Sequence, residues 1–181
     1  QFDYVDPKNR EVQLEMEKVC SIYLEKIGAL IKPNLNDVEF DEDFDTEASV
    51  IIPVRNREKT IADAIQSVLN QKTDFPFNLI IIDNQSTDKT TEIIDSFVKK
   101  DKRIIHIVPS RNDLGIGGCW QVGIEHRQCG KFAVQLDSDD VYETEETLQK
   151  IVSEFYKQKC AMLIGSYTMT NFEMEPIPPG L

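Results

Sequence analysis

The chain has 181 residues, 40% of them hydrophobic and 29% charged, and a formal net charge of −12. This length predicts one globular domain with an appended segment, and such a chain buries enough surface to fold without disulfides or a structural metal. The acidic balance argues against duplex nucleic acid as a partner, because binding to phosphates needs a basic surface.

Cysteine spacing and hydropathy bear on where the protein works. No apolar run approaches the length of a membrane span, and the first residues lack a secretory signal pattern. The four cysteines, at positions 20, 119, 129 and 160, lie far apart with no C-x-x-C pair. This argues against a zinc site and a disulfide framework and favours a reducing compartment, so we expect a cytoplasmic protein. Peripheral membrane association and the oligomeric state stay open.

The N-terminal part predicts a helix followed by an acidic linker. Asp6 suits a helix cap, Pro7 suits the first turn, and Pro33 ends the pattern. Apolar residues recur between them every three or four positions, in one stripe that should dock on another domain: Val12, Met16, Val19, Tyr23, Ile27 and Leu30. Seven acidic and no basic residues follow at 36–47. We therefore expect a helical extension at 1–35, a solvated linker at 36–47 and the main domain at 48–181.

From residue 48 onward, short apolar strands alternate with amphipathic helices. The strands are predicted at 49–54, 79–82, 104–108, 132–136 and 162–167. The helices are predicted at 58–70, 90–100, 117–126 and 145–156. This alternation predicts a three-layer α/β/α fold with a mostly parallel sheet. Ligands of such sheets bind beyond the carboxyl ends of the strands, and four of the predicted loops there are polar.

Three of these segments together resemble the ordered signatures of the family-2 inverting glycosyltransferases. The segments are SVIIPVRN at 49–56, IIDNQSTD at 81–88 and LDSDD at 136–140. The resemblance implies a GT-A fold, Rossmann-like, that binds a nucleotide-diphospho-sugar, with UDP-sugar as the first expectation. The implied enzyme transfers a hexosyl or N-acetylhexosaminyl group to a hydroxyl of a glycan or other acceptor, as in polysaccharide synthesis.

The same resemblance implies a set of site residues. The substrate-binding residues would be Pro53, Arg55, Asn56, Glu58, Asp83, Asn84, Ser86, Arg111, Asn112, Gly115, Asp137 and Ser138. In the D-x-D motif, Asp139 would bind Mn²⁺ or Mg²⁺ directly, and Asp137 would face the metal or the ribose. A divalent cation offsets the repulsion between these carboxylates and the diphosphate leaving group. Asp140 either joins this network or caps the next helix.

Several of these residues could instead be ordinary loop residues with a structural role. Asp83 would accept a base N–H in a charge-assisted hydrogen bond, or serve only as a turn residue. Ser86 and Asp88 precede a predicted helix and suit its N-cap, so we read Asp88 as structural. Arg111 either offsets diphosphate charge or forms a surface ion pair. Two positions depart from the family pattern: Arg55 stands where tyrosine is usual, and Asn84-Gln85 replaces an acidic-then-small pair.

The catalytic general base has no clear candidate in the sequence. The resemblance places it on an acidic motif beyond Leu181, so we expect a truncated domain that binds its donor and transfers sugar poorly. Glu173 and Glu175 are the acids that follow the last predicted strand.

Two other functions stay open, and two motifs are excluded. The chain could be a donor-binding module without catalysis, or Asp137 could be the nucleophile of a haloacid-dehalogenase-like phosphatase. An EF-hand would need Gly and Glu at the positions of Tyr142 and Leu148. A dinucleotide fingerprint would need Gly at the position of Trp120.

Overall fold

The computed structural model describes residues 9–31, 36–40, 43–111 and 113–177. The chain forms two compact units, of which the larger spans Val38–Leu163 and the smaller joins Gln1–Asp37 with Ile164–Leu181. The proposed donor site lies in the larger unit, which is described first.

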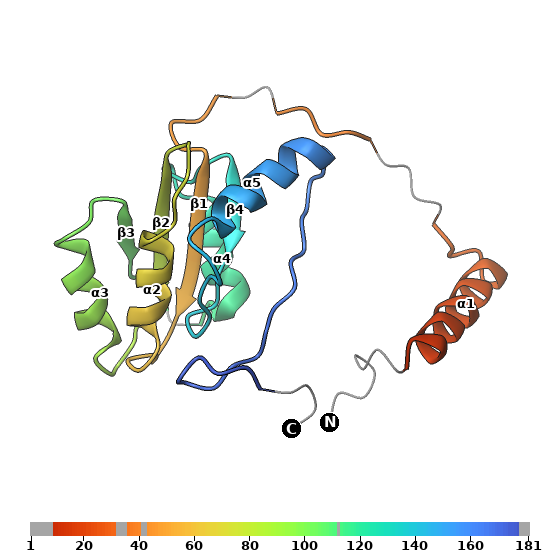
Figure 1. The fold of residues 1–181 in the computed structure, drawn as a ribbon, viewed down its shortest axis with the longest axis horizontal. Coiled ribbons are helices and arrows are strands. Elements are labelled where there is room, and N and C mark those ends of the chain that lie inside the picture. The colour runs from red at the N-terminus through yellow and green to blue at the C-terminus, as the bar shows by residue number, and fades with distance from the viewer. Residues whose placement is uncertain (1–8, 32–35, 41–42, 112, 178–181) are drawn as a thin grey trace. The chain divides into compact units, whose positions relative to one another are not determined.

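A parallel four-stranded sheet forms the centre of the larger unit (Figure 1). Its strands are β1 (Ala48–Val54), β2 (Phe77–Asp83), β3 (Ile104–Ile107) and β4 (Phe132–Gln135), in the order β3-β2-β1-β4. The register places Val50 of β1 beside Leu79 of β2 and Val134 of β4. The connecting helices are α2 (Ile61–Leu69), α3 (Thr90–Val98), α4 (Gly115–Ile124) and α5 (Thr147–Gln158). The predicted α/β class, the parallel sheet and the chain order of these elements are confirmed.

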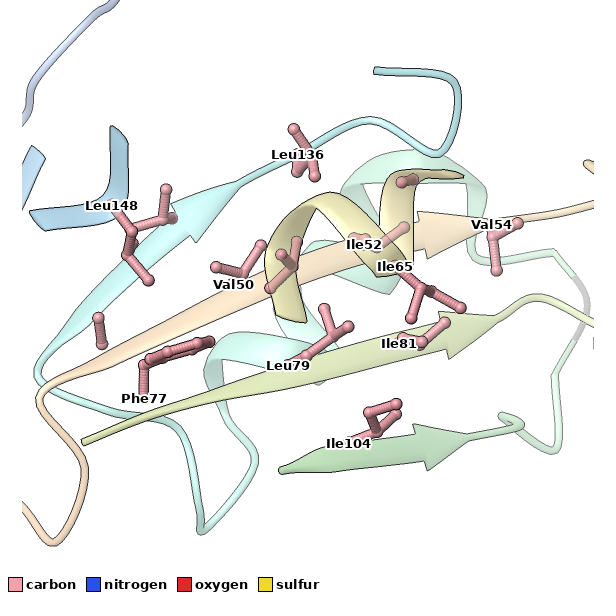
Figure 2. Close-up of a cluster of buried hydrophobic side chains, with 14 of the residues drawn as sticks. Val50, Ile52, Val54, Ile65, Phe77, Leu79, Ile81, Ile104, Leu136 and Leu148 are labelled. Atoms are coloured by element: carbon pink, nitrogen blue, oxygen red, sulfur yellow. The ribbon is translucent and has the colours of Figure 1, made fainter. Parts of the chain in front are cut away.

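The core has two parts because the sheet is buried on both faces. Alternate residues of β1 point to opposite sides: Val50 and Ile52 belong to a cluster with residues of α2, α3 and α5, whereas Ile51 packs with Cys119 of α4. Figure 2 shows the first cluster, in which Ile65 of α2 and Leu148 of α5 lie over the sheet. All seven residues of β1 are buried, as are all seven of β2. Burial of both faces explains why the strands read as continuous apolar runs rather than as alternating ones.

Helix α4 approaches the sheet closely at Gly123. A Cβ added there would lie 2.6 Å from Cγ2 of Ile51, which is fully buried. By contrast, a Cβ added at Gly117 of the same helix would meet nothing within 4 Å. The glycine at 123 therefore lets α4 cover β1.

We expect Gly123→Ala to lower the free energy of unfolding by about 1–3 kcal/mol, because an extra methyl group overpacks a filled core. Urea unfolding followed by circular dichroism measures this change. Gly117→Ala is the matched control, and it should stabilise by up to about 1 kcal/mol because alanine favours helix. Equal stability of the two variants would contradict the close packing of α4 on β1.

The predicted strand at 162–167 is wrong. No strand is assigned in this segment, and the side chains of Met162, Ile164 and Tyr167 are 73–81% exposed. Their apolar pattern alone cannot make a strand, which exists only when its backbone groups pair with a neighbour. The segment has a single isolated bridge nearby, between Thr170 and Pro176, among the described residues.

The N-terminal predictions are met in part. Helix α1 spans Arg10–Lys26 and buries none of its residues, so the docking of its apolar stripe stays a prediction. Asp6, Pro7 and Pro33 lie outside the described residues. The described residues of the acidic segment, 36–40 and 43–47, are irregular. They are not wholly solvated, because Phe40 packs edge-on against Phe132 and Tyr156 at 5.2 Å between ring centroids. None of the described helices is long and apolar enough to cross a membrane.

Candidate functional site

Four loops follow the carboxyl ends of the four parallel strands and therefore meet at one edge of the sheet. The strand order reverses between β1 and β4, because β2 and β3 lie on one side of β1 and β4 on the other. The loops after β1 and β4 touch across this reversal: Thr60 Oγ1 donates to Ser138 O at 2.9 Å, and Arg57 Nε lies 3.7 Å from Asp139 Oδ2. A reversal of this kind is where ligands of parallel sheets bind.

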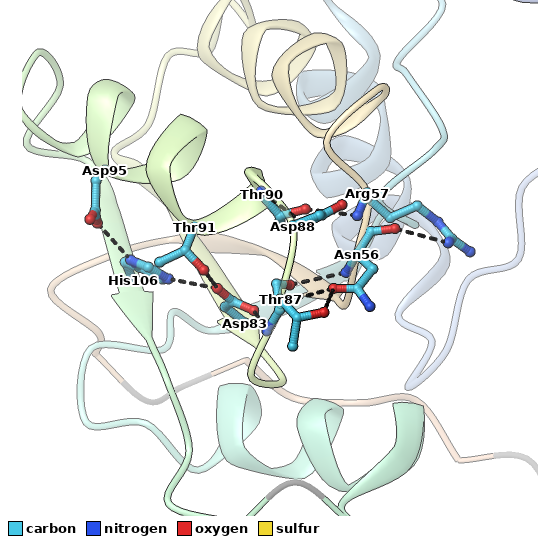
Figure 3. Close-up of polar contacts among 10 residues, drawn as sticks. Asn56, Arg57, Asp83, Thr87, Asp88, Thr90, Thr91, Asp95 and His106 are labelled. Atoms are coloured by element: carbon cyan, nitrogen blue, oxygen red, sulfur yellow. Dashed lines mark hydrogen bonds and ion pairs between the residues drawn. The ribbon is translucent and has the colours of Figure 1, made fainter.

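The loop after β1 is joined to the loop after β2 by hydrogen bonds (Figure 3). The Asn56 amide donates to Ser86 Oγ at 3.0 Å, and Asn56 Oδ1 accepts from the Thr87 amide at 2.7 Å. Asn56 has φ of 54°, and Gln85 has φ of 56°. Few non-glycine residues adopt this left-handed conformation, so the surrounding contacts must hold both in place.

A second pair of contacts links the same two loops. The Glu58 amide donates to Asp88 Oδ2, and the Lys89 amide donates to Glu58 Oε2, each at 3.1 Å. Asp88 Oδ1 also accepts from the Thr90 amide at 2.9 Å, at the start of α3. These bonds agree with the structural reading of Asp88. They show that Glu58 also helps to hold the two loops together. Contact of Glu58 or Asn56 with a bound donor stays a prediction.

Asp83 ends β2 and is fully buried. Its Oδ1 accepts from the Ser86 amide at 2.9 Å, and its Oδ2 accepts from Thr91 Oγ1 at 2.5 Å. Burial raises the pKa of a carboxyl group, but His106 and the hydrogen bonds from Ser86 and Thr91 outweigh burial here, so the pKa of Asp83 lies below its ordinary value. Asp83 is therefore an ionised acceptor, and part of its bonding capacity is already used within the protein.

Asn84 follows Asp83 and presents a different kind of group. Its amide donates to Val54 O at 2.8 Å, and its side chain is buried with a relative exposure of 7% for the residue. The side-chain Oδ1 has no hydrogen-bond partner among the described residues. A buried acceptor left unpaired is costly, so Asn84 is a point at which a donor group of a ligand would gain most. Pro53 of β1, which pairs in register with Ile82 of β2, is buried within the sheet.

The loop after β3 is held by Gln85 and by an ion pair of its own. Gln85 Nε2 donates to Pro109 O at 3.0 Å, which joins this loop to the one after β2. Arg111 makes two bonds to Asp113, at 2.9 and 3.0 Å, and both side chains are mostly exposed. Of the two readings, the structure shows the surface ion pair. Asn112 lies outside the described residues, and Gly115 begins α4 with φ of 59°.

The loop after β4 gathers acidic side chains in one turn. The Asp140 amide donates to Asp137 O at 3.1 Å and closes the turn, while Gln135 Nε2 donates to Asp137 Oδ1 at 3.1 Å. Burial, and then the charges of Asp137 and Asp139, raise the pKa of Asp140 above its ordinary value. The turn therefore holds concentrated negative potential. Asp139 is half-exposed, and Arg55 in the first loop is exposed.

Residues 49–180 match the family described as Glycosyl transferase family 2. The chain belongs to glycosyltransferase family 2. It is 34% identical over 125 residues to an uncharacterized glycosyltransferase of Haemophilus influenzae, which covers 69% of this chain and 48% of that protein. It is 31% identical over 129 residues to the putative teichuronic acid biosynthesis glycosyltransferase TuaG of Bacillus subtilis, over 71% of this chain and 50% of that protein.

A solved structure of S. aureus TarS 1-349 in complex with UDP-GlcNAc has the same fold, with a TM-score of 0.52 and 28% identity. The match covers 61% of this family-2 chain and 31% of the TarS chain. The chain thus spans about half the length of the two curated relatives and less of TarS. The fold is therefore of the GT-A type, and the phosphatase alternative for Asp137 is not supported by the family that matches.

The acidic turn at 137–140 has side chains of the kind that bind a divalent cation. Carboxylate oxygens are the ligands that Mg²⁺ and Mn²⁺ prefer, and three carboxylates, those of Asp137, Asp139 and Asp140, belong to this turn. No ready-made set of three or more ligands occurs among the described residues. Asp137 and Asp139 would therefore hold a cation together with oxygens of a diphosphate or water rather than in an all-protein cage.

Two further features are not part of this cluster of loops. A hollow of about 620 Å³ is lined by Phe40, Lys131, Phe132 and Phe155, at the start of β4 rather than at its carboxyl end. Glu173 and Glu175 lie in an exposed turn closed on Asn171, which belongs to the smaller unit. The general base of the reaction stays unassigned.

The sequence analysis assigned no role to His106. His106 Nδ1 lies 3.1 Å from Asp95 Oδ1, and Nε2 lies 3.7 Å from Asp83 Oδ2. The signal that could have indicated this pair is a polar residue in the middle of the apolar segment 104–108, which is the strand that follows Asp83 along the chain.

Proposed function

We propose that this chain is the donor-binding part of a glycosyltransferase that transfers a sugar from a nucleotide-diphospho-sugar to an acceptor hydroxyl with inversion. The observation that carries the proposal is the meeting of the acidic turn 137–140 with the loop after β1 at the reversal of strand order. UDP is the first choice of nucleotide, because TarS, at 28% identity, has been solved with UDP-GlcNAc. The transferred group is then a hexosyl or N-acetylhexosaminyl residue.

The roles within the site follow from its charges. Asp139 and Asp137 would hold Mn²⁺ or Mg²⁺, which when bound neutralises charge that develops on the leaving diphosphate. Asp83 and Asn84 would read the base, the first as an ionised acceptor and the second through its unpaired Oδ1. Ser138 and the loop 55–58 would line the phosphates. The name of the relative TuaG favours a role in polysaccharide synthesis.

The domain limits and the site of catalysis belong to the proposal as well. We propose that residues 48–181 belong to the GT-A domain and that the general base lies beyond Leu181. In that case the chain binds its donor and gives at most slow hydrolysis of the bound sugar. Efficient glycoside formation by this chain would overturn that part, and it would direct attention to Glu173 and Glu175.

A panel of nucleotide-sugars tests the proposal by thermal shift. With Mn²⁺ present, UDP-sugars should raise the melting temperature more than GDP-, dTDP- or ADP-sugars. A ligand at one hundred times its Kd stabilises the folded state by about 2.7 kcal/mol, which is a clear shift. Stabilisation by none of these nucleotides, with the protein folded, would contradict the proposed function. Stabilisation by a GDP- or dTDP-sugar instead of UDP-sugars would correct only the base.

A further inference from the structure

His106 lies between two carboxylates at the end of the sheet where the donor is proposed to bind. It belongs to β3 and is paired in register with Ile81 of β2. Its side chain is 12% exposed, and its two ring nitrogens face Asp95 of α3, at 3.1 Å, and Asp83 of β2, at 3.7 Å (Figure 3). The 3.7 Å contact is an ion-pair distance, and Nε2 has no hydrogen-bond partner in the described part of the chain.

This arrangement favours the imidazolium form of His106. Only the charged ring has an N–H on both nitrogens, so a neutral ring would leave one of the two carboxylates without an N–H and both without a cation. Asp83 is fully buried, whereas the Asp95 side chain is 54% exposed, so the loss matters most at Asp83. Asp83, and then Asp95, raise the pKa of His106 against the effect of its own burial. On the other face of the sheet, burial and the charge of Asp83 raise the pKa of Cys119.

Asp83 transmits this pairing to the two loops that bind the donor in the proposed function. Its Oδ1 accepts from the Ser86 amide at 2.9 Å, and Ser86 Oγ in turn accepts from the Asn56 amide at 3.0 Å. His106, Asp83, Ser86 and Asn56 thus form a continuous chain of contacts from β3 to the loop after β1. A buried carboxylate that loses its cation must reorganise or take up a proton, and either change would weaken its hydrogen bond from the Ser86 amide.

We propose that His106 is a positioning residue of the donor site, whose imidazolium holds the ionised Asp83 and through it the loops after β2 and β1. The inference rests on the proposed function and adds to it a pH dependence. The donor should bind most tightly while His106 is protonated. Affinity should fall as the pH rises through the pKa of His106, because the neutral ring no longer serves both carboxylates.

The test measures the affinity for UDP-GlcNAc with Mg²⁺ by calorimetry between about pH 5.5 and 8.5, a range that spans the ordinary pKa of histidine. UDP-GlcNAc is chosen because its diphosphate has no terminal phosphate group that titrates in this range. The wild-type affinity should fall about fivefold or more across the titration, the usual size of coupling between two sites. His106→Gln should bind UDP-GlcNAc weakly at every pH, so its affinity should not change with pH. His126→Gln, which changes the only other histidine of the chain, should keep the wild-type profile.

Two further measurements decide the inference even where His106→Gln fails to fold. Asp95→Asn should move the profile of affinity to lower pH, because it removes one of the two charges that favour the imidazolium. NMR titration of the His106 ring should give a higher pKa with UDP-GlcNAc bound than without it. The difference between the two pKa values should equal the logarithm of the fold-change in affinity across the pH range. A wild-type profile that is flat, or that His106→Gln leaves unchanged, overturns the inference while leaving the proposed function intact. Failure of the wild-type chain to bind any nucleotide-sugar contradicts the proposed function itself.

Discussion

Asp139→Ala should abolish the strengthening of nucleotide binding by Mn²⁺. The acidic turn and the diphosphate are both negatively charged, so they repel each other when no cation lies between them. A bound cation removes this repulsion. Asp139 is half-exposed and makes its one ion-pair contact among the described residues with Arg57 at 3.7 Å, so its removal should leave the fold intact. The affinity for UDP in Mn²⁺ should fall at least about tenfold, because even residues behind the ligands account for 10–100-fold in metal affinity.

Calorimetric titration of UDP, with Mn²⁺ and with EDTA, measures this effect. Glu143→Ala is the matched control, since it removes an exposed carboxylate a few residues farther along the same loop. The control should keep the difference between Mn²⁺ and EDTA, whereas Asp139→Ala should bind UDP equally in both. If the wild-type chain already binds UDP with the same affinity in EDTA, the acidic turn holds no metal that matters for the nucleotide.

Asp83→Ala should lower the free energy of unfolding by about 3 kcal/mol, because it removes the buried carboxylate that faces His106 and leaves the ring only the half-exposed Asp95. The Ser86 amide and the Thr91 hydroxyl also lose their acceptor. Glu92→Ala, an exposed residue in the first turn of α3, should cost less than about 1 kcal/mol. Urea unfolding at neutral pH measures both. A loss at Asp83 no greater than at Glu92 would show that the buried carboxylate contributes nothing.

The same variant should change how stability depends on pH. The pKa of Asp83 is lower in the folded protein than in the unfolded chain, so its contribution is fully present above the unfolded value of about 4. The contribution is lost as the pH falls through the folded value. The wild-type chain should therefore lose more stability on acidification than Asp83→Ala does. Parallel pH profiles of the two proteins would contradict the lowered pKa.

Much of the sheet was predictable because its strands are buried on both faces. Ile51 and Ile52 point to opposite sides, and both need apolar neighbours, so the sequence reads as an uninterrupted apolar run. The segment 162–167 also begins with apolar residues, but it pairs with no strand among the residues that the structure describes. Strand pairing is a property of the whole fold rather than of six residues. The loops containing Asp83 and Asp137 were predictable too, because polar residues directly after strands must lie at the carboxyl edge.

The partners of the site residues were not predictable. Asn56 and Glu58 are bound to the loop after β2, thirty or more positions away, and only the fold brings these loops together. The burial of Asn84 Oδ1 and the pairing of His106 with Asp83 depend on how β2 and β3 align, which a single strand does not reveal. The ion pair of Arg111 with Asp113 was easier to predict, because the two residues are only two positions apart. A surface ion pair was one of the two roles that the sequence analysis gave Arg111.

Helix α2 sets the shape of the acidic turn before any ligand arrives. Thr60, at its start, donates from Oγ1 to Ser138 O at 2.9 Å. Gln71, just after its end, donates to Thr144 O and accepts from the Leu148 amide, each at 2.8 Å. The Tyr142 amide reaches Ser67 Oγ between them at 3.3 Å. A loop fastened along the length of a helix has already lost its conformational entropy on folding, so a cation bound there need not order it. Substitution of Ser67 or Gln71, which contact the loop without being cation ligands, would then change cation affinity through the cost of ordering the loop.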